Sequence, residues 1–583
     1  MKFTSLLNNY RWYIVSAVVL TMVYFASRLI NLTDIPIFTD EAIYIRWAQI
    51  GGRDASWRYI SLTDGKQPLF VWVMMATVRL FSDPLFAGRI VSVGAGFLSL
   101  IGIAILAYEL FRKKSIALFA SLLYLTSPFA LMYDRLALMD SLLATFSIWS
   151  LFLAIRLVKT GRLDMALLLG MSLGGGVLTK TSGFISIYLL PATLLLFNFH
   201  QKEWKLKFAK LIGLMLVATM FSQAYYSILR LSPWFHMVEQ KDSTFVFPIK
   251  QWLIHPFRFF VSNLYSALEW MGGYLTIPLI ILIIIALFVD YKSIRRKTHL
   301  LLTWSIFSLL LTAIFVLWKY LPFLGLNDLG RTMQEKPIMF VFISAAPWVV
   351  ISLMYQKWWQ EKTLLLIWSL APLFGLSLFG KVLYPRFIFF MAMPLLILAA
   401  WGLSYITHSL GRYKKYVILI PVIFMIYPVY VQAKILYSAL TAPIPQADLN
   451  QYLNDIYSGW GVREVNATLE TLAQDQEITV FTDGTFGLMP YAIEIYLIDH
   501  PRIRIKGIFP SPANYSDDMN KEIRQRPTYY VSNQLQELPK YWNVELINEW
   551  QKGISDGRYL RLYRLYPQKQ KQEIDEEIPN QAL

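Results

Sequence analysis

The sequence contains no cysteine, few histidines and few charged residues. With no Cys and only six His in 583 residues, disulfides and thiolate metal sites are excluded and a zinc centre is not expected. Charged residues make up 16% of the chain, against about 25% in soluble domains. Hydrophobic residues reach 56% and aromatic residues 16%, which excludes an ordinary soluble enzyme and a disordered chain. The composition is typical of a membrane protein.

The charges that are present are mostly positive. Lys and Arg number 54 against 38 Asp and Glu, so the net charge is +16. In a soluble protein this excess would indicate nucleic-acid binding. In a membrane protein it is expected from cytoplasmic loops and from contact with anionic headgroups. We therefore expect membrane lipids as partners and no nucleic acid.

Long apolar runs predict a polytopic α-helical membrane protein, because a helix needs about 20 mainly apolar residues to cross the bilayer. We predict thirteen spans, at 12–30, 86–110, 115–131, 141–158, 163–179, 183–199, 208–229, 272–290, 300–318, 337–354, 363–380, 386–405 and 416–436. The first is interpreted as a retained helix, since no small-residue cleavage site accompanies it. The apolar run Pro68–Ser82 is too short to span comfortably and is interpreted as a helix in the outer interface.

Basic residues support this count, because they fall in alternate loops. The positive-inside rule makes the side that carries them cytoplasmic. They are Lys2, Arg11, Arg112–Lys114, Lys159, Arg162, Lys202, Lys205, Lys207, Lys210, Arg295–Lys297, Lys357, Lys362, Arg412, Lys414 and Lys415.

The sequence divides into three parts. Residues 1–436 are expected to form a transmembrane domain with a first outer loop at 31–85. Residues 437–567 have mixed polar composition and are expected to form an extracytoplasmic α/β domain, and the charged tail 568–583 is expected to be disordered. Within the α/β domain we predict strands at Ile478–Phe481, Arg502–Ile508, Thr528–Val531 and Tyr559–Tyr566, a turn at Thr482–Gly487 and a helix at Leu488–Ile498.

Two adjacent acids, Asp40 and Glu41, stand in the first outer loop. Helix capping is one interpretation and is favoured by the spacing: Thr39 or Asp40 would begin a helix, and acids stabilise its first turn. The other interpretation is a role in proton transfer, since adjacent carboxylates repel each other and are expected to have either basic partners or a chemical function. The sequence leaves both open.

Other polar residues are predicted at the same outer level. Each alone is equally well explained as a helix end or a snorkelling side chain. Because one topology places all of them on one face, we expect acids and bases there to surround one anionic, membrane-embedded substrate. They are Lys66, Gln67, Tyr133, Asp134, Arg135, Asp140, Lys180, Lys381, Tyr384 and Arg386.

The ordered series over about residues 10–410 resembles family 39 of the C-type integral-membrane glycosyltransferases (GT-C). The residues that carry it are Ile37–Ala42, Lys66–Leu69, Arg89, Tyr133–Leu136, Asp140, Leu178–Lys180 and Tyr384–Arg386. That family includes protein O-mannosyltransferases and the bacterial transferase that adds aminoarabinose to lipid A. The resemblance implies a GT-C fold.

The resemblance also implies transfer of a sugar from a polyprenyl-phosphate donor, outside the cytoplasm and with inversion, to a protein, lipid or glycan acceptor. It implies catalytic roles for Asp40, as the base, and for Glu41 and Asp140. Substrate binding would fall to Lys66, Arg89, Tyr133, Arg135, Lys180, Tyr384 and Arg386, with Arg135 as the basic companion of Asp140. The chain departs from the family at Gln67, a family proline, and at Thr181-Ser182, where Gly-Pro is common.

No cofactor is expected to be required and a divalent metal is not indicated, because Lys and Arg can stabilise a leaving phosphate. The outer loops 230–271 and 319–336 are candidates for lids or acceptor contacts. A bacterial or archaeal plasma membrane is the expected location. A transporter or lipid flippase is the alternative, but its ionisable groups would be expected at mid-membrane rather than at helix ends. A surface-polysaccharide polymerase or ligase is a third interpretation.

Overall fold

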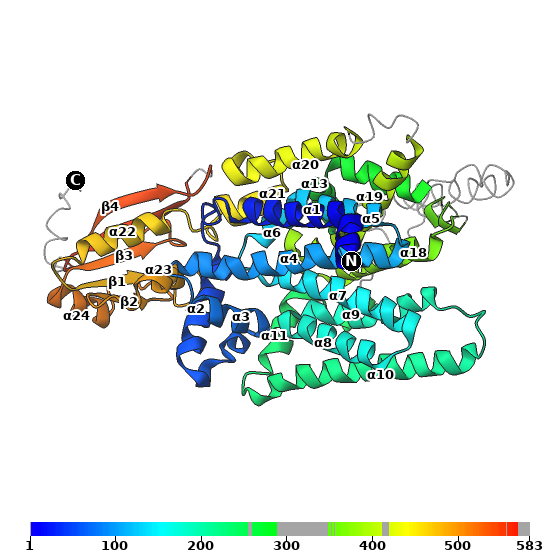
Figure 1. Cartoon of the computed structure of the whole chain (residues 1–583). Helices are drawn as coiled ribbons and strands as arrows, with labels where there is room; N and C mark the ends of the chain where they lie inside the picture. Colours follow the sequence, from blue (N-terminus) through cyan, green and yellow to red (C-terminus); the bar gives the residue numbers. More distant parts are fainter. Residues whose placement is uncertain are drawn as a thin grey trace, which may run out of the picture. The chain divides into compact units, whose positions relative to one another are not determined.

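The computed structural model describes residues 2–254, 259–288, 348–350, 352–354, 356–410, 419–554 and 557–568. The chain divides into two compact units (Figure 1). The first comprises residues 1–30, 58–72 and 90–445, and the second comprises residues 31–57, 73–89 and 446–583.

Helices account for the described secondary structure before residue 446. In chain order they are α1 (Lys2–Leu29), α2 (Thr39–Arg53), η1 (Ala55–Trp57), η2 (Ile60–Asp64), α3 (Leu69–Thr77), α4 (Pro84–Phe111), α5 (Lys114–Thr126), α6 (Pro128–Asp134), α7 (Met139–Thr160), α8 (Leu163–Thr179), η3 (Thr181–Gly183), α9 (Phe184–Tyr188), η4 (Leu190–Leu196), α10 (Trp204–Ser227), η5 (Ile228–Leu231), α11 (Met237–Phe245), α12 (Ile249–Ile254), α13 (Phe260–Phe288), α18 (Trp359–Phe379), η8 (Pro385–Ile388), α19 (Phe389–Ser409), α20 (Leu419–Tyr437) and η10 (Ala439–Thr441).

Seven helices within the described ranges are long and apolar enough to cross a membrane, and they make the chain a multi-pass membrane protein. They confirm seven predicted spans. They are Pro84–Phe111, Met139–Thr160, Trp204–Leu231, Phe260–Phe288, Trp359–Phe379, Pro385–Ser409 and Leu419–Tyr437. The predicted spans 300–318 and 337–354 lie wholly or largely outside the described residues, as do the loop 319–336 and almost all of the tail 568–583.

Three predicted spans do not form a single continuous helix. Residues 115–131 form α5 and α6, which bend by 61° at Ser127, because the following Pro128 lacks an N–H and disfavours the helical conformation of the residue before it. Residues 183–199 form α9 and the 3₁₀ helix η4, with Pro191 in the first turn of η4. The described part of the span 272–290 falls in α13, which is interrupted at Thr276, where φ is 62° and ψ is 155°. The prediction of one continuous helix was wrong at each of these places.

Three shorter apolar segments take other forms. The predicted span 163–179 is the 17-residue helix α8, and the predicted span 12–30 corresponds to α1, whose described apolar part is Ile14–Leu29. The predicted interfacial run Pro68–Ser82 contains α3, a helix of nine residues. At about 1.5 Å per residue, α3 is too short to cross the bilayer.

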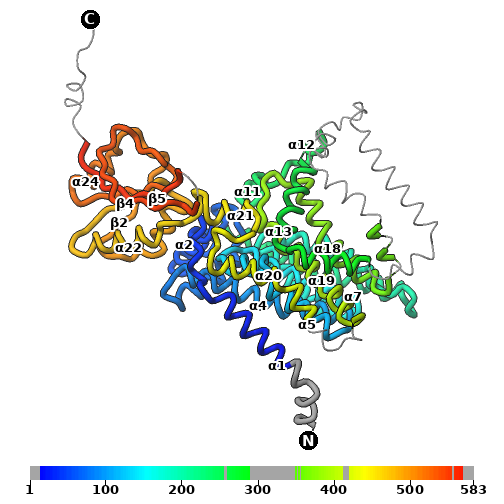
Figure 2. Tube along the Cα trace, turned by 90° about the horizontal axis from the view of Figure 1, so that it is seen from above, coloured from blue at the N-terminus to red at the C-terminus, as the bar shows by residue number. Residues whose placement is uncertain are grey.

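The helices of the first unit pack around α19, which contacts α5, α7, α13 and α18 (Figure 2). Glycines bring α8 close to its neighbours. A side-chain carbon at Gly170 would lie 2.8 Å from Cβ of Phe221 on α10, and one at Gly175 would lie 2.3 Å from the ring of Phe146 on α7. Such small-residue contacts are typical of packing between membrane helices.

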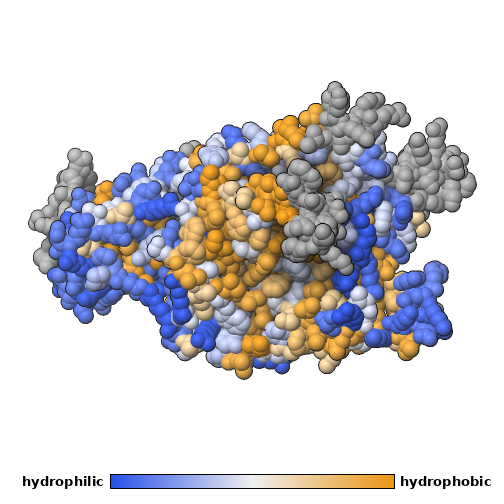
Figure 3. Space-filling model, in the orientation of Figure 1, coloured by the Kyte–Doolittle hydropathy of each residue, from blue (hydrophilic) through white to orange (hydrophobic). Residues whose placement is uncertain are grey.

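Apolar side chains gather on the visible face of the first unit (Figure 3). Exposed examples on different helices are Met22, Met220 and Ile277. A soluble protein would bury such large side chains, and a bilayer solvates them. In the second unit, hydrophilic side chains predominate over the sheet domain (Figure 3).

The second unit contains a five-stranded sheet of order β2-β1-β3-β5-β4. β1 pairs in parallel with β2 and β3, and β5 pairs antiparallel with β3 and β4. The elements after residue 445 are α21 (Gln446–Leu449), the π-helical η11 (Asn450–Asn454), α22 (Val462–Leu472), β1 (Ile478–Thr482), α23 (Leu488–Leu497), β2 (Ile503–Gly507), α24 (Asp517–Gln525), β3 (Thr528–Ser532), β4 (Val544–Gln551) and β5 (Tyr559–Leu565). Four strands and the helix at α23 match the predictions, whereas β4 was not predicted.

Part of the first outer loop folds within this second unit. Arg46 of α2 forms an ion pair with Glu494 of α23 at 2.6 Å, and Gln49 donates to the carbonyl oxygen of Ile495 at 2.9 Å. The backbone of Phe38 also forms a bridge with Ser458. These contacts join α2 to residues more than 400 positions later, so the environment of Asp40 and Glu41 is built partly by the end of the chain.

Candidate functional site

Asp140 and Lys180 meet at one end of the α7–α8 hairpin. Asp140 lies in the first turn of α7, and Lys180 directly follows the last residue of α8. Lys180 Nζ lies 2.6 Å from Asp140 Oδ1, and the side chain of Asp140 is only 5% exposed. The hairpin therefore holds a carboxylate and an ammonium group side by side, two residue types that the sequence predicted for one face.

An aromatic ring connects this pair to Arg386. Lys180 Nζ lies 4.4 Å from the ring centroid of Phe387, and the Arg386 guanidinium carbon lies 5.7 Å from the same centroid. Arg386 also lies over the ring of Tyr384, at 5.1 Å. Cations over aromatic faces are attracted by the ring quadrupole, so Phe387 holds two cations in one neighbourhood. Phe387 was not predicted as a site residue.

Lys66 belongs to the same neighbourhood through its loop. Its Nζ lies 3.4 Å from the carboxylate of Asp64. The next residue, Gln67, donates from Nε2 to Thr181 Oγ1 at 2.6 Å. Since Thr181 follows Lys180 in the chain, the loop that carries Lys66 is fixed beside the turn that carries Lys180.

Tyr133 and Arg135 are buried within the first unit. Arg135 donates to the carbonyl oxygens of Arg28 at 2.8 Å and Ile30 at 2.6 Å, at the end of α1. It therefore satisfies backbone acceptors that a helix terminus leaves without intrahelical partners. The ring of Tyr133 packs against Phe389, which follows η8, at 5.4 Å.

A charged pair beside them was not assigned a role from the sequence. Arg28 Nε lies 3.6 Å from Asp134 Oδ2, and both side chains are fully buried. Asp134 also accepts from Tyr124 at 3.1 Å and Ser141 at 3.1 Å. A charge alone in an apolar run could have indicated a buried partner, but the sequence does not say which one.

In the second unit, Glu41 forms a buried two-pronged ion pair with Arg89. Nε and Nη2 of Arg89 donate to the two carboxylate oxygens of Glu41 at 2.8 and 2.7 Å, and both side chains are 0% exposed. Arg89 also donates to the carbonyl oxygens of Leu32 and Ile35, and Glu41 accepts the N–H of Phe38 at 2.9 Å. Glu41 and Arg89 thus hold the outer loop around the start of α2.

Asp40 precedes Glu41 in the first turn of α2 and is half-buried. Consecutive helical residues point in directions about 100° apart, so Asp40 does not share the buried face of Glu41. The helix begins at Thr39, as the capping interpretation predicted. Phe38 is the N-cap, and the side chain of Glu41 completes the cap by accepting the backbone N–H of Phe38. A base role for Asp40 stays a prediction.

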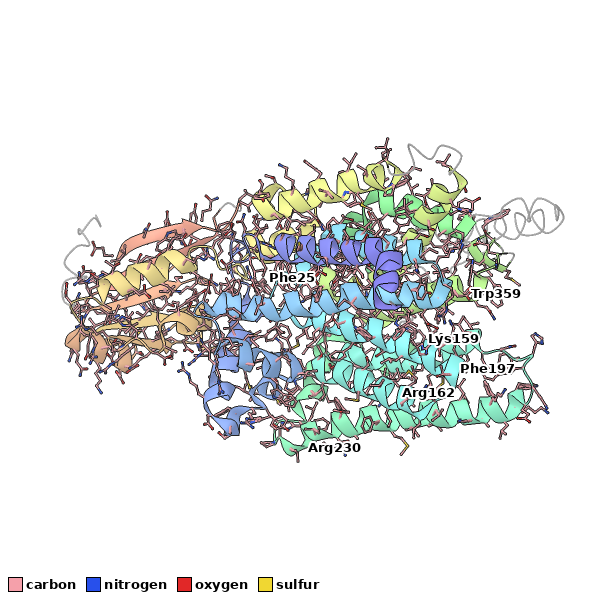
Figure 4. The ribbon with its side chains drawn as sticks, viewed as in Figure 1. Phe25, Lys159, Arg162, Phe197, Arg230 and Trp359 are labelled. Atoms are coloured by element: carbon pink, nitrogen blue, oxygen red, sulfur yellow. The ribbon has the colours of Figure 1, made fainter. Side chains whose placement is uncertain are left out.

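The opposite end of the α7–α8 hairpin carries basic residues around Glu109. Lys159 and Arg112 lie 3.1 and 2.7 Å from Glu109 Oε1, so two loops predicted to be cytoplasmic meet there. Figure 4 labels Lys159 and Arg162 near this end and Arg230 toward the other end of α10. α7 has 22 residues, or about 33 Å of helix at 1.5 Å per residue, which separates Asp140 from the basic loops by about the thickness of the bilayer core.

Within the first unit, the described groups are suited to holding an anion with a carboxylate nearby. Ammonium and guanidinium groups bind phosphate oxygens through charge-assisted hydrogen bonds. Across the described part of the chain no group of three His, Asp or Glu side chains is arranged to hold a metal ion. That no metal is required stays a prediction.

Comparison with known families supports the resemblance seen in the motifs. Residues 65–226 match the family described as dolichyl-phosphate-mannose-protein mannosyltransferase. The matched segment includes Lys66, Asp140 and Lys180, and it confirms the predicted similarity to GT-C glycosyltransferases. No curated protein sequence matches the chain.

Three solved structures of low sequence identity are similar to the chain. ArnT from Cupriavidus metallidurans in the apo state is 14% identical, with 95% of this chain and 98% of ArnT covered and a TM-score of 0.49. The archaeal oligosaccharyltransferase AglB from Archaeoglobus fulgidus is 14% identical, with 90% and 70% covered and a TM-score of 0.46. The protein O-mannosyltransferase Pmt1-Pmt2 complex of S. cerevisiae is 17% identical, with 40% and 35% covered and a TM-score of 0.31.

Proposed function

We propose that this chain is an inverting glycosyltransferase that moves a sugar from a polyprenyl-phosphate donor to an acceptor on the extracytoplasmic face of the plasma membrane. The family match over residues 65–226 supports the reaction class. The observation that carries the proposal is the cluster of Lys180, Asp140 and Arg386 around Phe387 at one end of the first unit.

In this proposal Lys180, Arg386 and Lys66 bind the donor phosphate. When the bond between the sugar carbon and the phosphate oxygen breaks, negative charge grows on that oxygen. Preorganised cations stabilise this charge in the transition state, and in a site from which water is excluded their effect is larger. Asp140 holds Lys180 in place through their ion pair at 2.6 Å.

Asp40 is the proposed general base. It takes the proton of the acceptor hydroxyl while the hydroxyl oxygen attacks the sugar carbon opposite the phosphate, which inverts that carbon. The products are the glycosylated acceptor and polyprenyl phosphate. Glu41, held by Arg89, positions the first turn of α2. Residue charges supply the stabilisation, so the proposal needs no metal ion.

The sidedness of the molecule supports an outer location for this site. The basic loops around Glu109 lie at the end of α7 opposite to Asp140. By the positive-inside rule, those loops are cytoplasmic. Asp140 and Lys180 are then on the extracytoplasmic side, where a lipid-linked sugar would meet its acceptor.

A transporter or lipid flippase is the second candidate, and one observation favours it. The buried Arg28–Asp134 pair lies beside the bend between α5 and α6, and transporters often combine broken helices with buried charges. Here, however, Asp134 is already engaged by Arg28, Tyr124 and Ser141, which suits a structural role.

A transfer assay in detergent separates the two. Purified protein is given undecaprenyl-phosphate-linked radiolabelled sugars and a cell-envelope extract as the source of acceptor. The proposal predicts labelled product from the wild type and its loss in Asp140→Asn and Lys180→Met. Matched exposed controls, Asp164→Asn and Lys202→Met, should retain activity. A flippase has no output without compartments, so absence of product from folded wild-type protein, across the sugars tested, would overturn the proposal.

A further inference from the structure

Two segments that carry cations of the proposed site are joined by a hydrogen bond between side chains. Gln67 follows Lys66, and Thr181 follows Lys180. Gln67 and Thr181 are 114 positions apart, yet Gln67 Nε2 donates to Thr181 Oγ1 at 2.6 Å. Gln67 is only 3% exposed. The loop of Lys66 and the turn of Lys180 are therefore coupled in space.

A third segment, α11, lies beside both of them. Burial raises the pKa of Asp242 on α11, and the neighbouring hydroxyl of Thr181 opposes that rise. α11 also packs on the loop that carries Lys66, because a side-chain carbon at Gly65 would lie 2.3 Å from the carbonyl oxygen of Met237.

α11 makes two further contacts with the segments that carry the cations. Lys241, next to Asp242, lies 2.7 Å from Asp64, and Asp64 also contacts Lys66. At the end of α11, the N–H of Lys381 donates to the carbonyl oxygen of Phe245 at 2.8 Å. The strand-like segment that contains Lys381 leads directly to Tyr384 and Arg386. One short helix thus contacts all three segments that bear Lys66, Lys180 and Arg386.

The turn at Lys180 has little freedom apart from this contact. The N–H of Lys180 donates to Gly176 at 3.1 Å, and its carbonyl oxygen accepts from Gly183 at 2.8 Å. A side-chain carbon at Gly183 would lie 2.3 Å from the backbone of Gly176, so the turn is tightly packed. The bond from Gln67 to Thr181 therefore fixes the point from which the Lys180 side chain extends.

We propose that α11 is the positioning element of the anion site, and that the Gln67–Thr181 hydrogen bond sets the spacing of its cations for a lipid phosphate. The inference rests on the proposed function, because it names the structure that prepares that site. Gln67 and Thr181 are positioning residues: they act through Lys66, Lys180 and Arg386 rather than on the substrate. Without this bond the three cations would still be present, but their geometry would be looser.

The test is binding of undecaprenyl phosphate to the full-length protein in detergent. Thr181→Val keeps the shape of the side chain and removes the acceptor of the bond from Gln67, and we expect it to raise the Kd about tenfold, as loss of a hydrogen-bonded group implies. Thr181→Ser restores the hydroxyl and should bind within about twofold of the wild type. Thr244→Val, at an exposed position of α11 whose hydroxyl bonds the Lys241 carbonyl oxygen, is the matched control.

A double-mutant cycle distinguishes positioning from general weakening. If Gln67 and Thr181 act as one unit, Gln67→Met combined with Thr181→Val should bind no more weakly than Thr181→Val alone. In the transfer assay, Thr181→Val should raise KM for the donor more than it lowers kcat, with a Tm equal to that of Thr244→Val. The inference would be overturned, with the proposed function left intact, if the increases in Kd of Gln67→Met and Thr181→Val multiply in the double variant. An unchanged Kd in Thr181→Val, while the wild type binds, would overturn it in the same way. A wild type that binds no undecaprenyl phosphate would overturn the proposed donor as well.

Discussion

Lys180 Nζ lies 2.6 Å from Asp140 Oδ1, and this contact closes the open end of the α7–α8 hairpin. The two residues are 40 positions apart, at the beginning of one helix and just after the end of the next. An ion pair at this place orients the lysine side chain. The pair is therefore both a structural contact and the centre of the proposed donor site.

Replacements of Lys180 test separately the positive charge and the geometry of the group that carries it. Lys180→Met removes the cation beside the leaving phosphate and should lower kcat/KM by about 10²- to 10³-fold, the usual effect of losing one transition-state donor. Lys180→Arg keeps the charge but changes its geometry, and it should retain more activity than the methionine variant. Equal activity of Lys180→Met and the wild type in the transfer assay would remove Lys180 from the site.

The adjacent acids Asp40 and Glu41 should respond differently. Asp40→Asn should lower kcat by about 10²- to 10⁴-fold, as expected for loss of a general base, with little change in stability. Glu41→Gln should instead lower stability, because Glu41 accepts from Arg89 and Phe38 in a fully buried site. Parallel measurements of kcat and of unfolding in urea check both. The same stability loss in both variants would contradict the assignment.

Arg89 should be essential for the stability of the second unit. Arg89→Met leaves the buried carboxylate of Glu41 without its ionic partner, and breaking a buried pair in this way costs about 3–5 kcal/mol. Arg53→Met, which breaks an exposed pair with Asp499, should cost less than about 1 kcal/mol. Urea unfolding of the purified proteins measures both. A smaller loss for Arg89→Met than for Arg53→Met would show that the buried pair contributes little.

The second unit should become more stable as pH rises above neutrality. Burial lowers the pKa of Lys552 to about 7, although nearby Asp483 opposes the shift. The unfolded chain, with an ordinary lysine pKa near 10.5, then binds more protons than the folded chain between pH 7 and pH 10. Stability should therefore rise with pH in that window, by up to about 1.4 kcal/mol per pH unit.

Pulse proteolysis in urea at pH 7, 8 and 9 checks this rise. Lys552→Met should remove most of it, whereas the exposed Lys540→Met should leave it in place. The carboxyl group of Asp483, whose pKa burial raises to about 6, titrates below this range. A pH dependence that is the same in Lys552→Met and the wild type would assign the effect to other groups.

Hydropathy predicted the long helices well but not the form of the chain where prolines interrupt it. The span predicted at 86–110 is the helix Pro84–Phe111, since no proline interrupts that run. Residues 183–199 are as apolar, yet Pro191 and 3₁₀ turns divide them. Strand β4 was missed because Val544–Gln551 is mostly exposed and its apolar and polar residues do not alternate regularly, as is usual for an edge strand of this kind.

The site could be predicted as a set of residue types but not as a set of pairs. The sequence placed Asp140, Lys180 and Arg386 on one face because helix ends alternate across the bilayer. It gave no reason for Phe387 to lie between two cations, or for Gln67 to reach Thr181. Asp242 and Lys241 were missed, because the outer loop 230–271 carries several other charges and its sequence does not distinguish these two. Such contacts depend on tertiary packing, which spacing along the chain does not encode.

The most direct test of the central claim is a structure of the full-length protein with bound undecaprenyl phosphate. The measured quantity is the distance from the phosphate oxygens to Nζ of Lys180 and to the guanidinium of Arg386. The account predicts hydrogen-bond distances to both, with Lys66 on the same phosphate. A phosphate bound instead by Lys159 and Arg112, at the Glu109 end of α7, would contradict it.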